Sequence, residues 1–230
     1  PFAGRDPRMA MTIIYPGMDW NGTVVNTLDK TINGKDNANY PPSANNASKT
    51  ALTWRKYLDE QYANGIWNTN ACPIVIRYAE VLLTYAEAVN ELSGPSADVY
   101  DKLDLIRGRV GMPKVDREKY ASKETLRRLI RRERGVELAG EGVRRADILR
   151  WKDDNGKMVA ETVLNGVLER VVGTVNYAET DPTKRAEIDT NAPATDKKIE
   201  DRVFKVHNRY NPIPQGAIDN NPNLEQNPGY

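Results

Sequence analysis

The residues best suited to acid–base chemistry lie in one charged run in the second half of the chain. Glu133 and Glu137 are four residues apart, so a helix places both carboxylates on the face that carries Leu126 and Ile130. Two carboxylates can serve as the acid and the base of a glycoside hydrolase. Side chains at this spacing are, however, typically about 5–6 Å apart on one convex helix and do not face each other across a cleft.

The same glutamates have many basic neighbours along the chain. Carboxylates on an apolar face are costly unless they are paired, and ion-pair networks commonly resemble active sites in their charge pattern. A buried network that locks helices together is therefore favoured over catalysis. Its predicted members are Glu133, Arg134, Glu137, Glu141, Arg144, Asp147 and Arg150.

Aromatic residues among amides, carboxylates and glycines form a second pattern, within the first 72 residues. Flat rings stack on the apolar faces of sugars, while neighbouring polar groups bond to the hydroxyls. Trp20 lies between Asp19 and Asn21 in a Gly-rich turn, and Tyr40 lies in a small, polar stretch. These four residues are the predicted ligand-binding residues.

Rings in loop-rich regions also hold loops against helices. For Trp54, Tyr57 and Trp67 this structural role is favoured. For Trp20 and Tyr40 the sequence supports packing and sugar binding about equally.

Composition argues against several other classes of site. The chain of 230 residues carries 33 Lys and Arg against 32 Asp and Glu, so it has no overall basic field for nucleic acid. One Cys and one His cannot form a usual zinc site or an intrachain disulfide. There is no Gly-rich phosphate loop, signal-peptide pattern or membrane-length apolar run. We expect no metal, no cofactor and no nucleic-acid partner.

Two helices are predicted by apolar residues at three-four spacing. The first covers about 78–92 and ends at Gly94 and Pro95, and the second runs from near Ser96 to Val110. Their short connection predicts an antiparallel hairpin that resembles one tetratricopeptide-type repeat. A single hairpin cannot bury both of its faces, so something else must cover it.

The charged run follows on two further helices. One begins at Ser122, a typical N-cap residue, and extends toward Leu138. The other is short and covers about 143–151. We expect the first 72 residues to be loops with short extended pieces.

Shorter features are predicted outside these helices. They are a strand at Met11–Tyr15, a surface loop at Asn33–Lys49, an antiparallel ribbon pairing Val167–Tyr177 with Val203–Tyr210, an exposed loop at Glu179–Lys198, and an irregular tail from Asn211.

The predicted fold is therefore mainly α, with a tetratricopeptide-like hairpin, further helices, long irregular loops and a small β-ribbon. We divide the single predicted domain into three regions. Residues 1–72 are a loop-rich aromatic region contributing to a ligand site, 73–152 are helical, and 153–230 are irregular with the ribbon.

Four motifs, in order along the chain, resemble those of SusD/RagB-type proteins. They are Arg5–Arg8, Ile76–Ala88, Glu133–Trp151 and Asn211–Tyr230. The chain departs from the family pattern at Gly140, where an aromatic residue is usual, and at Gly135. Both glycines should loosen local helix packing.

The resemblance implies the carboxy-terminal half of a surface lipoprotein of Bacteroidetes. Such proteins capture an oligosaccharide or related nutrient without chemistry and pass it to a SusC-type TonB-dependent transporter in the outer membrane. The lipid anchor and further helices would lie in the amino-terminal half. The alternatives are a glycoside hydrolase using Glu133 and Glu137 and a helical-repeat scaffold for a protein partner.

Overall fold

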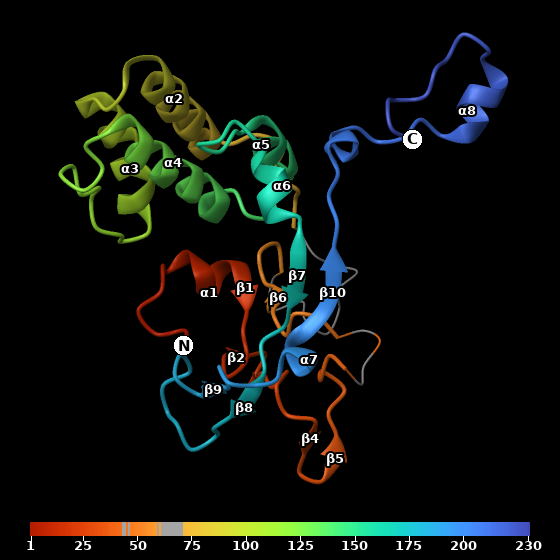
Figure 1. The fold of residues 1–230 in the computed structure, drawn as a ribbon. Coiled ribbons are helices and arrows are strands. Elements are labelled where there is room, and N and C mark those ends of the chain that lie inside the picture. Colours follow the sequence, from red (N-terminus) through yellow and green to blue (C-terminus); the bar gives the residue numbers. More distant parts are fainter. Residues whose placement is uncertain (43–44, 46, 59, 61–70) are drawn as a thin grey trace. The chain divides into compact units, whose positions relative to one another are not determined.

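The computed structural model describes residues 1–42, 45, 47–58, 60 and 71–230 (Figure 1). Contacts divide the chain into two compact units. The first combines Pro1–Arg144 with Arg170–Lys197, and the second combines Arg145–Glu169 with Lys198–Tyr230. The longest elements are helices, and the sheets of the described residues have two strands each. The predicted mainly α fold with small ribbons is confirmed.

Three helices of the first unit pack together (Figure 1). They form the largest hydrophobic core among the described residues. They are α2 (Tyr78–Ser93), α3 (Ala97–Arg109) and α4 (Lys123–Glu137). Gly94 follows α2 with φ 79°, and the Ser96 hydroxyl accepts the Val99 N–H at the start of α3. Ser122 and Thr125 form a capping box at the start of α4. The predicted hairpin and its end signals are confirmed.

The predicted apolar stripe of these helices is buried. Leu83, Leu103 and Leu126 are each 0% exposed and pack in one cluster with Ile130. Burial of one such side chain typically contributes about 1.5–3 kcal/mol. This cluster fixes the inward face of α4, which also carries the charged residues.

The amino-terminal segment builds short elements around tight turns. They are α1 (Arg8–Thr12), β1 (Ile13–Ile14) paired with β6 (Thr53–Trp54), the hairpin of β2 (Asp19–Trp20) and β3 (Thr23–Val24), and the hairpin of β4 (Thr31–Ile32) and β5 (Lys35–Asp36). The predicted strand at Met11–Tyr15 is therefore reduced to two residues that follow a helix. Asn21 and Gly22 have φ 49° and 74°, which suits the type I′ turn of a hairpin.

The stretch Asn33–Lys49 is not wholly the predicted surface loop. Asn33 and Gly34 form the turn between β4 and β5. Asn37 is 5% exposed, and its side-chain amide donates to the carbonyls of Asn26 and Asp29. This buried amide holds the second hairpin against the chain that precedes it.

The predicted exposed loop at Glu179–Lys198 contains ordered elements. β9 (Ala186–Ile188) pairs with β8 (Gly173–Val175), and α7 covers Ala194–Lys197. Ala186 is buried with Val175, Leu28 and Ala51 in a second core. As far as Lys197, the segment belongs to the first unit. The small side chain of Ala186 fills space there beside the amino-terminal hairpins.

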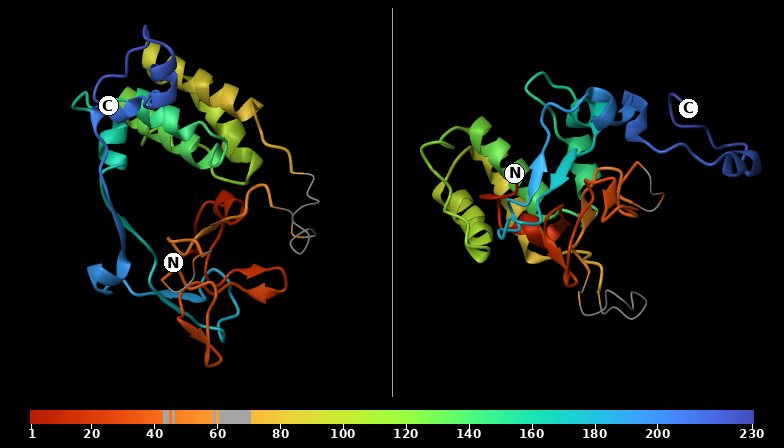
Figure 2. Two further views of the ribbon diagram at one scale, coloured as in Figure 1. Left: turned by 90° about the vertical axis from the view of Figure 1, so that its right-hand side faces the viewer. Right: turned by 90° about the horizontal axis from the view of Figure 1, so that it is seen from below.

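The second unit contains the helices α6 (Val159–Val163) and α8 (Gln215–Asn220), the 3₁₀ helix η3 (Val206–Arg209), and the ribbon of β7 (Gly166–Glu169) with β10 (Lys198–Arg202). It also contains α5 (Arg144–Arg150) except for Arg144, which belongs to the first unit. The two strands lie side by side in Figure 2.

The predicted ribbon exists only in part. Its first strand, β7, includes Val167–Glu169 of the predicted Val167–Tyr177, whereas β8 pairs with β9 instead. Its second strand was placed wrongly at Val203–Tyr210. The side chain of Asn165 accepts the Phe204 N–H and donates to the Phe204 carbonyl. Both backbone groups are thereby removed from strand pairing. Phe204 packs instead with Ile148 and Met158 in the core of this unit.

Among the described residues, each helix is too short or too polar to cross a bilayer. The division into regions 1–72, 73–152 and 153–230 stays a prediction.

Candidate functional site

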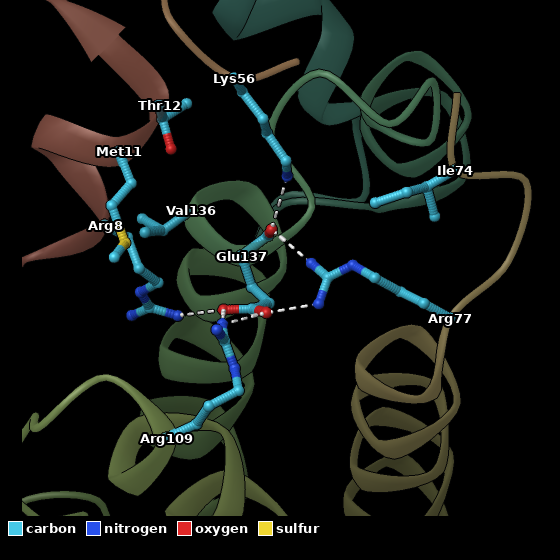
Figure 3. Close-up of a pocket in the computed structure, with 9 residues that line it drawn as sticks. All are labelled: Arg8, Met11, Thr12, Lys56, Ile74, Arg77, Arg109, Val136 and Glu137. Carbon is cyan, nitrogen blue, oxygen red and sulfur yellow. Dashed lines mark hydrogen bonds and ion pairs between the residues drawn. The ribbon is translucent and has the colours of Figure 1, made fainter. Parts of the chain in front are cut away.

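Glu137 lies at the centre of a buried charged cluster at the end of α4. Glu133 and Glu137 are each 3% exposed and lie on the same inward side of the helix as Ile130. Their carboxylates are surrounded by cations from distant parts of the sequence, which Figure 3 shows for Glu137.

Three guanidinium groups share the carboxylate of Glu137 (Figure 3). Its Oε1 accepts from Arg77 Nη1 at 2.6 Å and from Arg109 Nη2 at 2.7 Å. Its Oε2 accepts from Arg8 Nη1 at 3.0 Å and from Arg109 Nη2 at 2.9 Å. Burial acts to raise the pKa of Glu137, but the hydrogen bonds from Arg77 and Arg8 outweigh it and hold the pKa below its usual range. Glu137 is therefore ionised.

Arg8 connects α1 to this cluster. It is 4% exposed, and its Nη2 donates to Asp6 at 2.6 Å and to Glu133 at 2.8 Å. Arg107 of α3 also pairs with Glu133. The segment Asp6–Arg8, noted above only as part of a family motif, thus supplies the cation between two acids of α4.

Glu141 closes the cluster beyond the end of α4. It accepts from Arg77 Nε at 2.7 Å and from Lys56 Nζ at 2.5 Å. Lys56 also donates to the carbonyl of Glu137, the last residue of α4, and to that of Ala139 beyond the helix. The same cations keep the pKa of Glu141 below its usual range against the opposing effect of burial.

The remaining predicted members of the network lie elsewhere. Arg134 is buried, and its Nε lies 3.7 Å from Glu87. Asp147 and Arg150 pair at 2.7 Å within the second unit. Arg144 is exposed, and its Nη1 would lie 3.4 Å from a Cβ at residue 135, which is glycine.

Sequence reasoning missed the main partners of the glutamates. These are Arg8, Lys56, Arg77, Arg107 and Arg109. Arg8 lies in the motif Arg5–Arg8, and Arg77 lies in the motif Ile76–Ala88. That both motifs occur in one chain with the Glu-rich motif was the only sign in the sequence that these residues belong together. Ion pairs between residues so far apart in the sequence depend on the tertiary fold. The spacing of neighbouring residues therefore does not predict them.

A pocket of about 210 Å³ opens over Glu137 (Figure 3). Arg8, Lys56, Arg77 and Arg109 line it together with Met11, Thr12, Ile74 and Val136. Glu137 lacks the proton that a general acid needs, and its oxygens are occupied by N–H donors. The geometry therefore suits electrostatic binding better than acid–base chemistry.

The predicted sugar platform around Trp20 is a hairpin with engaged side chains. Trp20 is half-buried against the cluster of Ile14, Tyr15 and Met18, and the Arg55 guanidinium lies 5.2 Å from its ring centroid. These contacts hold the indole in place and leave part of it accessible.

The polar neighbours of Trp20 have separate structural roles. Asp19 Oδ1 accepts from Arg185 Nη1 at 2.6 Å. Asn21 provides the left-handed backbone of the turn. Tyr40 is half-buried, and the Arg170 guanidinium lies 5.6 Å from its ring centroid.

Trp54 occupies a second candidate site. It is 54% exposed and lines a pocket of about 370 Å³ with Ser48, Thr50 and Thr53. This pocket combines an accessible indole with three hydroxyl groups, which is suitable chemistry for a sugar. Sequence reasoning favoured a structural role for this ring and missed the hydroxyls. Trp67 lies outside the described residues.

Gly140 accommodates the ring of Trp54. Gly140 has φ 76°, and a Cβ there would lie 3.5 Å from Trp54 and 3.8 Å from Tyr57. Two rings thus contact the position at which an aromatic residue was expected.

Across the described residues, no group of His, Cys, Asp and Glu is suited to hold a metal ion.

A family model and a curated relative both match the chain to SusD-type proteins. A sequence model of the SusD family matches residues 1–230. A SusD-like protein of Formosa agariphila is 34% identical over 154 residues, which are 62% of this chain and 29% of that protein.

Two solved structures from Bacteroides fragilis are similar over nearly the whole chain. One is a SusD-like protein with 25% identity and a TM-score of 0.72, covering 100% of this chain and 39% of its own. The other is a SusD-like carbohydrate binding protein with 31% identity and a TM-score of 0.69, covering 97% and 42%. The chain therefore spans less than half the length of these relatives.

Proposed function

The chain belongs to the SusD family, and on this premise we propose that it is part of a protein that captures a glycan or related nutrient without catalysis. The match of the family over residues 1–230 carries the proposal. It is supported by the similar structure whose description is a SusD-like carbohydrate binding protein.

The Trp54 pocket is the sugar-binding surface that the side chains support best. Its volume of about 370 Å³ is in the range of small-molecule sites, which are typically about 300–1,000 Å³. The ring would contact the apolar face of a sugar. The Ser48 and Thr50 hydroxyls donate to the Leu52 carbonyl, so their oxygens, with that of Thr53, would accept hydrogen bonds from the sugar hydroxyls. Trp20, Asp19, Asn21 and Tyr40 remain proposed as further contacts.

Binding without hydrolysis agrees with the state of the two glutamates of α4. Glu133 and Glu137 are buried and paired with arginines, so neither carboxylate is an accessible nucleophile. The ion-pair network is thus proposed to be structural.

The family also leads us to propose the destination of the ligand. The whole protein would be a lipid-anchored protein on the outer membrane of the cell surface, delivering its nutrient to a SusC-type TonB-dependent transporter. A scaffold that binds only protein partners is the rival proposal, and it would bind no saccharide.

A glycan array followed by calorimetry on the full-length protein tests the binding function. We expect saccharide binding and no release of reducing sugar. Aromatic anchors typically lose about 2 kcal/mol or more on truncation, so Trp54→Ala should weaken binding at least about 30-fold. Tyr210→Ala is the matched control, because Tyr210 is a 47% exposed ring that does not line the Trp54 pocket. Absence of any saccharide binding would refute the proposal, as would robust hydrolysis lost in Glu133→Gln.

A further inference from the structure

We propose that the pocket over Glu137 binds an anionic group, a carboxylate or a sulfate ester, carried by an acidic saccharide. The saccharide part of this inference rests on the proposed function. The pocket is distinct in its lining from the pocket of Trp54, so the two can be tested separately.

The lining of the pocket has an excess of positive charge. Four of its side chains are cations and one is a carboxylate. The carboxylates of Asp6, Glu133 and Glu141 and the guanidinium of Arg107 lie around it. Within the described cluster, five cations therefore meet four carboxylates, and one positive charge is left for a ligand.

Arg109 is the cation best placed to bind that ligand. Its side chain is 56% exposed, whereas those of Arg8 and Arg77 are 5% and 25% exposed. Its bonds to Glu137 come from Nη2 alone. Among the described residues, no acceptor is hydrogen-bonded to Nε or Nη1 of Arg109.

Glu137 does not depend on Arg109 for its pairing. Arg77 donates to one of its carboxylate oxygens and Arg8 to the other. Arg109 can therefore turn part of its planar fork toward an incoming anion without leaving a buried charge unpaired. A guanidinium fork matches the two oxygens of a carboxylate or sulfate.

The apolar residues of the pocket favour an anion attached to a ring over a free inorganic ion. Met11, Ile74 and Val136 line the pocket beside the cations, and Met11 is 62% exposed (Figure 3). A volume of about 210 Å³ corresponds to roughly seven waters at about 30 Å³ each, which exceeds the size of one sulfate. The space suits the acid group together with part of the sugar ring.

Calorimetry on the full-length protein at matched ionic strength tests the inference. The ligands are glucuronic acid, glucose 6-sulfate, glucose and inorganic sulfate. We expect at least one acidic sugar to bind at least about tenfold more tightly than glucose, because charge-assisted hydrogen bonds are the strong ones. The difference in affinity between glucuronic acid and glucose 6-sulfate shows whether the carboxylate or the sulfate is recognised.

Two variants locate the site. Arg109→Gln should weaken the acidic sugar about tenfold or more, while Arg117→Gln should not, because Arg117 is similarly exposed but pairs with Asp101 outside the pocket. Met11→Glu is a second variant that removes none of the charged residues and places a carboxylate that repels anions at the pocket. It should also weaken acidic sugars and not glucose.

Equal affinities for acidic and neutral sugars, or unchanged binding in folded Arg109→Gln and Met11→Glu, would overturn the inference. So would binding of inorganic sulfate without any acidic sugar. In the first two cases saccharide capture itself still stands. Failure of all glycans on the array would refute the proposed function separately.

Discussion

At the scale of single residues, one guanidinium explains why the charged cluster can be buried. Arg8 is held by Asp6 from its own segment and by Glu133 and Glu137 from α4. Arg77 performs the same task between Glu137 and Glu141. Each acid thus meets more than one donor, which is the condition for tolerating charge at low exposure.

Removing Glu137 should be strongly destabilising. Glu137→Ala would leave the nearly buried Arg8 and the partly buried Arg77 without a shared acceptor, so we expect a loss of about 3–5 kcal/mol in the free energy of unfolding. Urea denaturation measures the loss. Glu200→Ala is the control, because Glu200 is 56% exposed and its pair with Arg202 should contribute less than about 1 kcal/mol. An unchanged unfolding midpoint for Glu137→Ala would rule out a stabilising network.

Acid should weaken the cluster in a defined direction. The pKa values of Glu137 and Glu141 are lowered in the folded protein, so their contribution is present above the unfolded pKa of about 4.3 and is lost as the pH falls through the folded values. Stability of the wild type should therefore fall with decreasing pH below about 4.3. Glu141→Gln should show a shallower fall. Equal slopes for both proteins would contradict this assignment.

At the scale of elements, the sequence predicted what depends on local periodicity and caps. Helices α2, α3 and α4 follow from apolar spacing and from Gly94, Ser96 and Ser122. The two Asn-Gly hairpins were also accessible, because that dipeptide is a strong signal for a type I′ turn. They were missed because their strands have only two residues each.

Features that depend on distant contacts could not be predicted in the same way. The residues after Arg202 have the composition of a strand. In the structure, however, the side chain of Asn165 hydrogen-bonds to the N–H and the carbonyl of Phe204, and these groups do not pair with a strand. In the Trp54 pocket, likewise, Ile13 lies beside the ring only because β1 pairs with β6. Tertiary contacts of this kind override local propensity.

The capping box of α4 allows a direct test at this scale. Ser122 accepts the N–H of Thr125, so Ser122→Ala should lower the free energy of unfolding by about 1 kcal/mol. Ser122→Thr keeps the acceptor and should retain most of the stability. Thermal and urea unfolding of the two variants measure the difference. Equal destabilisation by both substitutions would show that the cap hydrogen bond is not responsible.

At the scale of the whole molecule, the helical hairpin presents an apolar face to solvent. Tyr78, Val81 and Tyr85 are 70%, 52% and 44% exposed and follow one another at helical spacing on α2. Leu105 of α3 is 58% exposed, and Lys102 on the preceding turn of α3 lies over the Tyr85 ring. The chain covers 39% and 42% of two similar structures, so we expect further chain in the whole protein to cover this face.

The 230-residue chain on its own should therefore self-associate. Soluble monomers rarely expose contiguous apolar patches beyond a few hundred Å², and association would bury these side chains. Light scattering should show a mass above that of a monomer at micromolar concentration. The double variant Val81→Glu with Leu105→Glu should restore the monomer, because charge on the patch opposes its burial. Val203→Glu, at a 74% exposed apolar position of the second unit, should leave the association unchanged. A monomeric wild-type chain would show that this face tolerates water and needs no covering segment.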